Sequence, residues 1–300
     1  MNQREAFRPV DRETAGTLSA SEAIQYHYDN ETRFFSLFLD KTLSYSAARF
    51  HVPNRAEPVL DNLHDAQWAK IRFHLDALQL KPGARILDVG CGWGAVLAAA
   101  VTEYEARGAL GLTLSRDQRD HIVGRNLPGV EVRLEDVYEA TLEGTFDGIV
   151  SVGAFEHFAR PAMDKSQKIE AYRRFFEICH ANLVPNGLVS LQTIVWDTPT
   201  FEEAKTWIPE TVFPQSDIPF IDEVVTASHP LFRLEYLENR REDYVLTLDQ
   251  WIRNLRAAKD EIVATWDREK YDFFEHYLRN SKLAFARRKN ALSRFVLRRR

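Results

Sequence analysis

The chain has 300 residues, of which 45% are hydrophobic, so it can form one substantial domain with a smaller insertion but not two independent large domains. Its formal net charge is −5, so the chain lacks the overall excess of positive charge that is typical of nucleic-acid-binding proteins. This argues against nucleic acid as a partner. The spacing of its two cysteines, Cys91 and Cys179, fits neither a zinc site nor a disulfide framework. The first residues lack the apolar run of a signal peptide, so we expect a cytoplasmic protein with no metal site.

The N-terminal part, residues 1–80, is expected to form an arm and a helical lid. Residues 1–20 are polar and aperiodic, which is typical of a flexible arm. An aromatic-rich segment from Ser21 to Leu39 has helical spacing, and apolar residues recur at the same spacing from Ala56 to Leu80. We therefore expect helices before the main sheet.

Residues 81–195 alternate between short apolar runs and helical segments, and we expect them to form the core of the fold. The predicted strands are 85–89, 108–112, 130–134, 146–152 and 188–194, and the predicted helices are 95–104, 115–124 and 165–183. Strands that alternate with helices at this spacing indicate a parallel sheet covered on both faces. The expected fold class is α/β, with a Rossmann-like sheet.

The C-terminal third is less regular. Five prolines interrupt residues 196–231, which we expect to form an inserted cap over the substrate pocket. Residues 232–300 are predicted to supply the remaining core strands, near 234–236, and C-terminal helices over 248–283. The tail from 279 to 300 holds nine Lys or Arg and no acid, which favours a solvated helix end with a frayed terminus. The alternative is a basic surface that guides a carrier protein or an anionic membrane face.

A glycine-rich loop, Asp88-Val-Gly-Cys-Gly-Trp-Gly94, follows the first predicted core strand and opens a helix. A dinucleotide dehydrogenase would show Gly-x-Gly-x-x-Gly and an acid about twenty residues later. Here the spacing is Gly-x-Gly-x-Gly, and Thr113 and Gln118 stand where the acid is expected. This pattern is typical of class I methyltransferases, in which the loop holds the amino-acid part of S-adenosylmethionine. Alternatively, Thr113 and Gln118 only cap the helix that starts near Ser115.

The candidates for cofactor binding share positions at the ends of the predicted strands, where parallel α/β folds bind ligands. Asp136 follows the third strand, where an adenine-binding residue normally lies. The candidates in this part of the chain are Asp88, Gly90, Gly92, Gly94, Thr113, Gln118, Asp136 and Val137.

Other segments carry a family resemblance. They are His27–Asp40 followed by Tyr45-Ser46, Gly-Leu-Thr-Leu-Ser at 111–115, Ser-Val-Gly-Ala-Phe-Glu-His-Phe at 151–158, Phe213-Pro214 with Ile218-Pro219, and Tyr-Val-Leu-Thr-Leu-Asp-Gln-Trp at 244–251. Over residues 24–285 the chain closely resembles the cyclopropane-fatty-acid synthase family, and the mycolic acid cyclopropane synthases in particular. The resemblance implies a class I methyltransferase fold with N-terminal helices and an inserted helical cap.

Members of this family transfer the methyl group of S-adenosylmethionine to an alkene carbon, and many are thought to hold a bicarbonate ion as the base. The resemblance implies that Tyr45 and Ser46 contact the cofactor. It also implies that the Glu156 side chain, the Tyr244 hydroxyl and backbone amides near Ala47 and Val152 form the bicarbonate cradle.

Two positions depart from the family pattern: this chain has Ala47 where the family has Cys, and Gln192 where it has His. Gln192 can hydrogen-bond an anion but cannot shuttle a proton near neutral pH. His157 is a further catalytic candidate, with a purely structural histidine as the alternative. The four catalytic candidates are therefore Glu156, Tyr244, His157 and Gln192.

A set of aromatic residues is expected either to cover the cofactor and stabilise a cation or to form ordinary core; its members are Tyr28, Phe35, Tyr45 and Phe155. Trp196, Trp207 and Phe220 favour a short aromatic substrate pocket.

The loss of the histidine leads us to expect a C-methyltransferase that uses S-adenosylmethionine on an electron-rich unsaturated or aromatic carbon of a small natural product or lipid. Two alternatives stay open at this point. One is a cyclopropane synthase that acts on unsaturated fatty acyl chains, and the other is a non-catalytic S-adenosylmethionine-binding protein. The sequence leaves the oligomeric state open.

Overall fold

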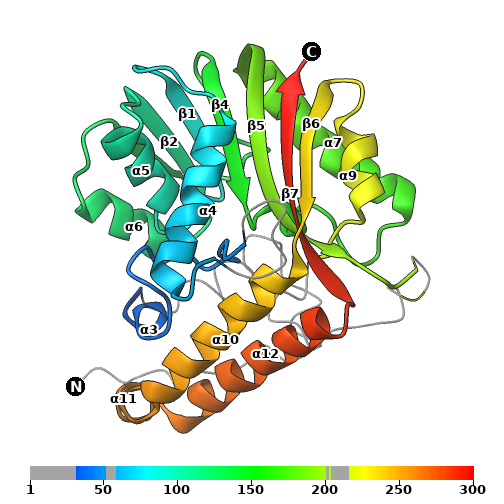
Figure 1. Cartoon of the computed structure of the whole chain (residues 1–300). Helices are drawn as coiled ribbons and strands as arrows, with labels where there is room; N and C mark the ends of the chain where they lie inside the picture. Colours follow the sequence, from blue (N-terminus) through cyan, green and yellow to red (C-terminus); the bar gives the residue numbers. More distant parts are fainter. Residues whose placement is uncertain (1–31, 52–58, 201–202, 204–215) are drawn as a thin grey trace.

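The structure is a computed structural model, and it describes residues 32–51, 59–200, 203 and 216–300. Within these residues the core is a seven-stranded sheet in the order β3-β2-β1-β4-β5-β7-β6 (Figure 1). The α/β fold class predicted from the alternating pattern is confirmed. The predictions for residues 1–31, including Tyr28, and for Trp207 and Phe213-Pro214 lie outside the described residues.

Five parallel strands form most of the sheet: β1 (Arg85–Val89), β2 (Gly108–Thr113), β3 (Val130–Leu134), β4 (Phe146–Val152) and β5 (Leu183–Trp196). Each contains the apolar run that predicted it. The runs of β1, β2 and β4 are almost wholly buried, because helices cover both faces of a parallel sheet.

Helices lie on both faces of the sheet, as Figure 1 shows. One face carries α4 (Leu63–Ala77), α5 (Ala95–Glu103) and α6 (Arg116–Gly124), and the other carries α7 (Lys165–Asn182) and α9 (Ile221–Ser228). The described part of the expected insertion at 196–231 thus includes α9, which packs on α7 and β6.

The last two strands are antiparallel to their neighbours. β6 (Phe232–Asn239) lies at the edge, and β7 (Asn290–Arg299) pairs with both β5 and β6. The prediction of a solvated, frayed tail is therefore wrong for the residues after α12 (Arg268–Ala286). Seven consecutive residues from Ala291 to Leu297 are buried because β7 lies inside the sheet.

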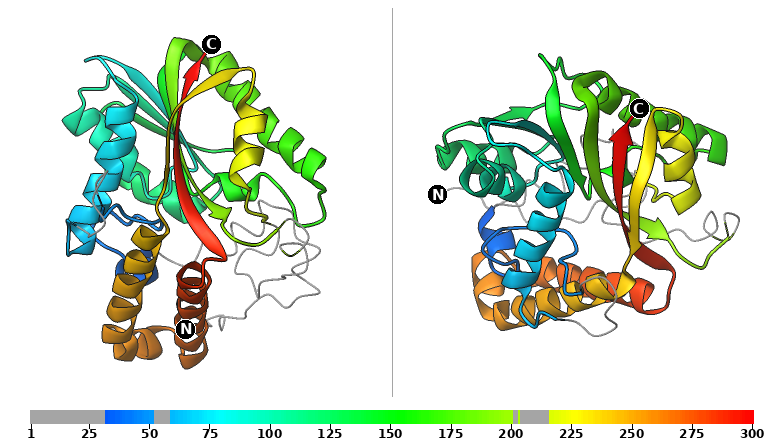
Figure 2. Two further views of the ribbon diagram at one scale, coloured as in Figure 1. Left: turned by 45° about the vertical axis from the view of Figure 1, so that its right-hand side comes forward. Right: turned by 45° about the horizontal axis from the view of Figure 1, so that its top comes forward.

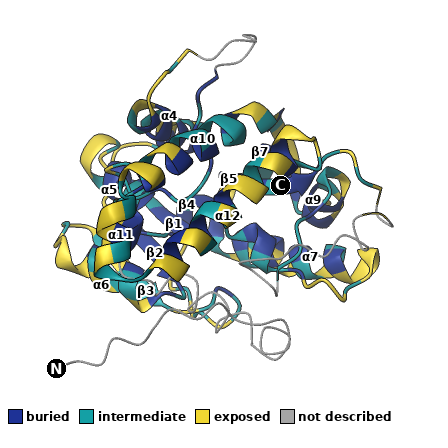
Figure 3. Ribbon diagram, turned by 90° about the horizontal axis from the view of Figure 1, so that it is seen from below, coloured by how far each residue is buried: buried dark blue, intermediate teal, exposed yellow. Residues whose placement is uncertain are grey.

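A helical layer lies at the carboxyl ends of the parallel strands (Figures 1 and 2). It contains α3 (Thr32–Ser36), α10 (Arg241–Ala257), α11 (Lys259–Thr265) and α12 (Arg268–Ala286). α10 and α12 pack side by side, and their outward faces are exposed while the strands behind them are buried (Figure 3). The helices over this end of the sheet thus come largely from the segment between β6 and β7.

No helix among the described residues is both long and apolar enough to cross a membrane.

Candidate active site

A pocket of about 360 Å³ opens at the carboxyl ends of β1, β2 and β4. Its lining includes nine of the predicted cofactor-binding residues: Tyr45, Ser46, Asp88, Gly90, Gly92, Thr113, Gln118, Asp136 and Val137. The tenth, Gly94, does not line the pocket. It is the N-cap of α5. The structure therefore brings together residues from five separate stretches of chain, and their contact with a cofactor stays a prediction.

The glycine loop adopts a shape that side chains would disturb. Gly90 has φ +78°, and a Cβ there would lie 2.4 Å from the Cβ of Ala154. A Cβ on Gly92 would meet no atom within 4 Å, because this residue faces the pocket. The loop thus brings backbone close to the pocket while it packs tightly against the segment after β4.

Thr113 and Gln118 combine the two roles that the sequence left open. The Thr113 hydroxyl donates to Gln118 Oε1 at 2.7 Å, and the Gln118 backbone amide donates to the side chain of Ser115, the N-cap of α6. Both residues also line the pocket. The hydrogen bond with Thr113 holds the Gln118 amide in one orientation, so the pair can present polar groups to a ribose.

Lys70 and Asp88 are buried charged residues that line the same pocket, 2% exposed each. Burial raises the pKa of Asp88 to about 7, against the opposing effect of the Lys70 charge. Burial lowers the pKa of Lys70 to about 8, which Asp40 partly opposes. Sequence reasoning missed Lys70. The sequence signal that could have identified Lys70 is its core-facing position on an amphipathic helix, one turn after the buried Gln67.

Glu156 lies in the short 3₁₀ helix η1 (Phe155–His157), behind the pocket wall and only 7% exposed. Its Oε1 accepts a hydrogen bond from the Ile194 backbone amide at 2.6 Å, while its Oε2 is buried without a hydrogen-bond partner. Burial raises the pKa of this carboxyl above its usual value, against the opposing hydrogen bond from Ile194. An unsatisfied buried carboxylate oxygen calls for an occupant that can donate a hydrogen bond.

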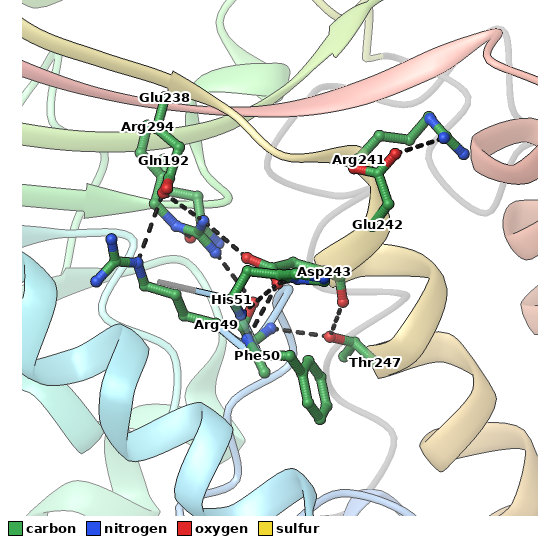
Figure 4. A network of polar contacts seen from close by, with 11 residues as sticks. Arg49, Phe50, His51, Gln192, Glu238, Arg241, Glu242, Asp243, Thr247 and Arg294 are labelled. Atoms are coloured by element: carbon green, nitrogen blue, oxygen red, sulfur yellow. Dashed lines mark hydrogen bonds and ion pairs between the residues drawn. The ribbon is translucent and has the colours of Figure 1, made fainter. Parts of the chain in front are cut away.

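Gln192 lies on β5 beside Val152 of β4, and both ends of its amide contact protein groups. Its Nε2 donates to the Ala47 carbonyl at 3.2 Å. Its Oε1 accepts from Arg294 Nε at 2.8 Å (Figure 4). The role of Gln192 in anion binding stays a prediction. In the structure its amide joins the loop containing Ala47 to Arg294 of the sheet.

Arg294 is fully buried at the centre of a polar network (Figure 4). Its Nη1 pairs with Glu238 and Asp243, each at 3.0 Å, and its Nη2 donates to the Ala48 carbonyl. Asp243 also accepts hydrogen bonds from the backbone amides of Phe50 and His51. The network connects β5, β6, β7 and α10 to the loop beside the pocket.

His157 and Tyr244 have different surroundings. His157 lines the pocket, its Nδ1 lies 2.5 Å from Ser216 Oγ, and burial lowers its pKa to about 4. It is therefore neutral at neutral pH. Tyr244 lies on α10 outside the pocket lining, and its ring centroid is 4.4 Å from that of Phe285.

The aromatic residues divide between two clusters. Phe35 and Tyr45 have ring centroids 5.1 Å apart, and Tyr45 is also 5.1 Å from Trp251, in the cluster that Tyr244 and Ile194 contact. Phe155 instead stacks on Tyr172 at 4.4 Å, on the α7 side of the sheet. Phe155 thus has the core role that the sequence allowed, and the group beside the pocket is built around Tyr45.

The family model described as mycolic acid cyclopropane synthetase matches residues 16–295. The chain belongs to this family. Among its relatives is cyclopropane mycolic acid synthase 2 of Mycobacterium bovis, 35% identical, with 92% of this chain and 94% of the relative covered. Another is the S-adenosylmethionine-dependent methyltransferase UmaA of Mycobacterium tuberculosis, 33% identical, with 92% of this chain and 96% of the relative covered.

Solved structures agree with this membership. The cyclopropane synthase MmaA2 from Mycobacterium tuberculosis has a TM-score of 0.80 at 31% identity, with 94% of this chain and 99% of that chain covered. The mycolic acid cyclopropane synthase CmaA1, complexed with SAH and CTAB, has a TM-score of 0.80 at 32% identity, with 95% of this chain and 100% of that chain covered. The chain is an enzyme of the S-adenosylmethionine-dependent methyltransferase class, and S-adenosylmethionine is its cofactor, as the glycine loop predicted.

Proposed function

We propose that this methyltransferase is a cyclopropane synthase that acts on the alkene of an unsaturated fatty acyl chain. Relatives named as cyclopropane mycolic acid synthases match more than nine-tenths of both chains. This favours the alternative that the sequence analysis placed second, over methylation of a small natural product. CmaA1 binds CTAB, which carries a long alkyl chain, and this supports an acyl substrate.

The observation that carries the proposal is the buried Glu156, with one carboxylate oxygen anchored by Ile194 and the other without a partner. The bound cofactor supplies an electrophilic methyl group. The alkene π electrons form a bond to the methyl carbon while the carbon–sulfur electron pair stays with sulfur, which leaves a carbocation on the neighbouring carbon. A fixed anion in a dry site stabilises such a cation.

Ring closure needs a base that removes a proton from the transferred carbon, so that the carbon–hydrogen electron pair forms the third side of the ring. The bicarbonate ion that the family implies would donate its hydroxyl to Glu156 Oε2, which has no hydrogen-bond partner in the described structure, and would accept from backbone near Ala47 and Val152. Gln192 fits this role less well, because Ala47 and Arg294 already engage its amide.

The engaged Gln192 also favours a second candidate, in which the cation loses a proton from the acyl chain and the product is a methyl-branched alkene. S-Adenosylmethionine with a trideuterated methyl group separates the two. We expect a cis-unsaturated acyl phospholipid to gain a carbon, lose its double bond and retain two of the three deuterium atoms, as read by mass spectrometry. A branched alkene that retains all three deuteriums would replace the main proposal, and no transfer to unsaturated lipid would refute both.

A further inference from the structure

Lys70 is a buried cation with no carboxylate at ion-pair distance among the described residues. Its Nζ donates to the Ser46 hydroxyl at 3.0 Å, and among the described residues the lysines that form ion pairs are others, Lys165, Lys168 and Lys282. Desolvation of an ammonium group is costly unless an anion and hydrogen bonds replace the water. A hydroxyl supplies a hydrogen bond but no charge, and Asp40 and Asp88 act on the ammonium group only from beyond ion-pair distance. The ammonium group can therefore accept a closer anion.

The place of Lys70 in the pocket indicates where an anion would bind. Lys70 comes from α4 and lines the pocket with Ser46 and Asp88, whereas Asp136, the predicted adenine contact, follows β3. Asp88 at the end of β1 gives this part of the pocket a buried carboxyl as well as an ammonium group. A carboxyl and an ammonium facing one cavity are complementary to a zwitterion.

S-Adenosylmethionine has such a zwitterion at its amino-acid end, and its α-carboxylate is the only carboxylate of the molecule. We infer that Lys70 binds the α-carboxylate of S-adenosylmethionine and that Ser46 orients the lysine for this contact. Lys70 is then a specificity residue for the amino-acid end of the cofactor. The inference rests on the cofactor assignment alone and does not depend on the acceptor or on ring closure.

Decarboxylated S-adenosylmethionine tests the inference, because it lacks only this carboxylate. Calorimetry without acceptor should show that the wild-type protein binds S-adenosylmethionine about 10- to 100-fold more tightly than the decarboxylated compound, as a charge-assisted hydrogen bond predicts. Lys70→Met should bring the two affinities close together, mainly through weaker binding of S-adenosylmethionine. Lys70→Arg should restore much of the preference.

Lys81→Met is the matched control, because it removes one exposed lysine outside the pocket and changes the net charge equally. It should leave the preference at the wild-type value. Two results would overturn the inference: wild-type protein that binds both compounds equally, or Lys70→Met protein that retains the wild-type ratio. Equal binding of the two compounds by the wild-type protein would overturn the inference even if Lys70→Met fails to fold, which a melting curve would reveal.

Discussion

The environment of Gln192 restricts what any side chain at this position can do. Arg294 Nε needs an acceptor there and the Ala47 carbonyl needs a donor, and one primary amide supplies both. A histidine meets both needs only when it is neutral, because a protonated imidazole has no acceptor for Arg294. Burial lowers the pKa of the nearby His74, and the Arg294 charge lowers it further. A residue beside Arg294 is therefore suited to positioning rather than to carrying a proton.

Glu156 is the residue for which we predict the largest effect on turnover. Glu156→Gln preserves an acceptor for the Ile194 amide but removes the charge, so turnover of labelled cofactor should fall about 100-fold or more. Because Glu156 does not line the pocket, calorimetry should show cofactor affinity close to the wild-type value. A fully active variant would exclude the proposed role, and an equal loss of cofactor affinity would show that the site had collapsed.

At the scale of an element, the loop between β1 and α5 uses its glycines for two purposes. Gly92 faces the pocket, whereas a Cβ on Gly94 would lie 2.8 Å from the Ile122 side chain of α6. Both glycines have positive φ, so any side chain introduced at either position would strain the backbone. Side-chain atoms added at Gly92 would enter the space predicted for the cofactor. Side-chain atoms added at Gly94 would instead contact protein.

Gly92→Val should therefore abolish S-adenosylmethionine binding in calorimetry, with a loss of stability of about 1–2 kcal/mol from backbone strain. Gly94→Val carries the same strain and about 1–3 kcal/mol more from overpacking against Ile122. Urea denaturation should rank Gly94→Val as the less stable variant. Unchanged cofactor affinity in Gly92→Val would refute the role of the loop.

At the scale of the whole molecule, the Arg294 network joins segments that lie far apart in sequence. Arg294 on β7 contacts Ala48, Gln192, Glu238 and Asp243, and their separations reach 246 residues (Figure 4). Asp243 immediately precedes Tyr244 on α10. The same ion pairs therefore hold the helical layer and the pocket loop in place relative to the sheet.

Arg294→Met should lower the free energy of unfolding by about 3–5 kcal/mol, because it leaves the Glu238 and Asp243 charges buried without their partner. Arg298→Met on the same strand is the control. Arg298 pairs with Glu235 nearer the surface, so its loss should cost about 1 kcal/mol or less. Denaturation midpoints compare the two, and equal midpoints would show that the network contributes little to stability.

Much of the fold and of the candidate site could be predicted from local sequence patterns. β1, β3 and β4 begin and end where the apolar runs predicted, and nine cofactor-binding candidates line one pocket. These features could be predicted because buried strands and glycine turns depend on residues that are adjacent in the sequence. The resemblance at Glu156 and Tyr244 pointed correctly to the family. The sequence by itself thus determined the fold class, the cofactor and the candidate carboxylate.

Only the tertiary structure decided how the C-terminal third is used. The ten residues of β7 include three arginines, so the sequence pattern predicted a basic tail. The segment from Ala291 to Leu297 nevertheless contains the apolar residues of a buried strand. Arg294 can be buried there because Glu238, Asp243 and Gln192 arrive from other elements. Lys70 carried a local signal, a lysine at a core-facing helix position, but the pocket that it lines is formed by residues of other elements. The partner of a buried charge is chosen by contacts across the fold, which no local pattern contains.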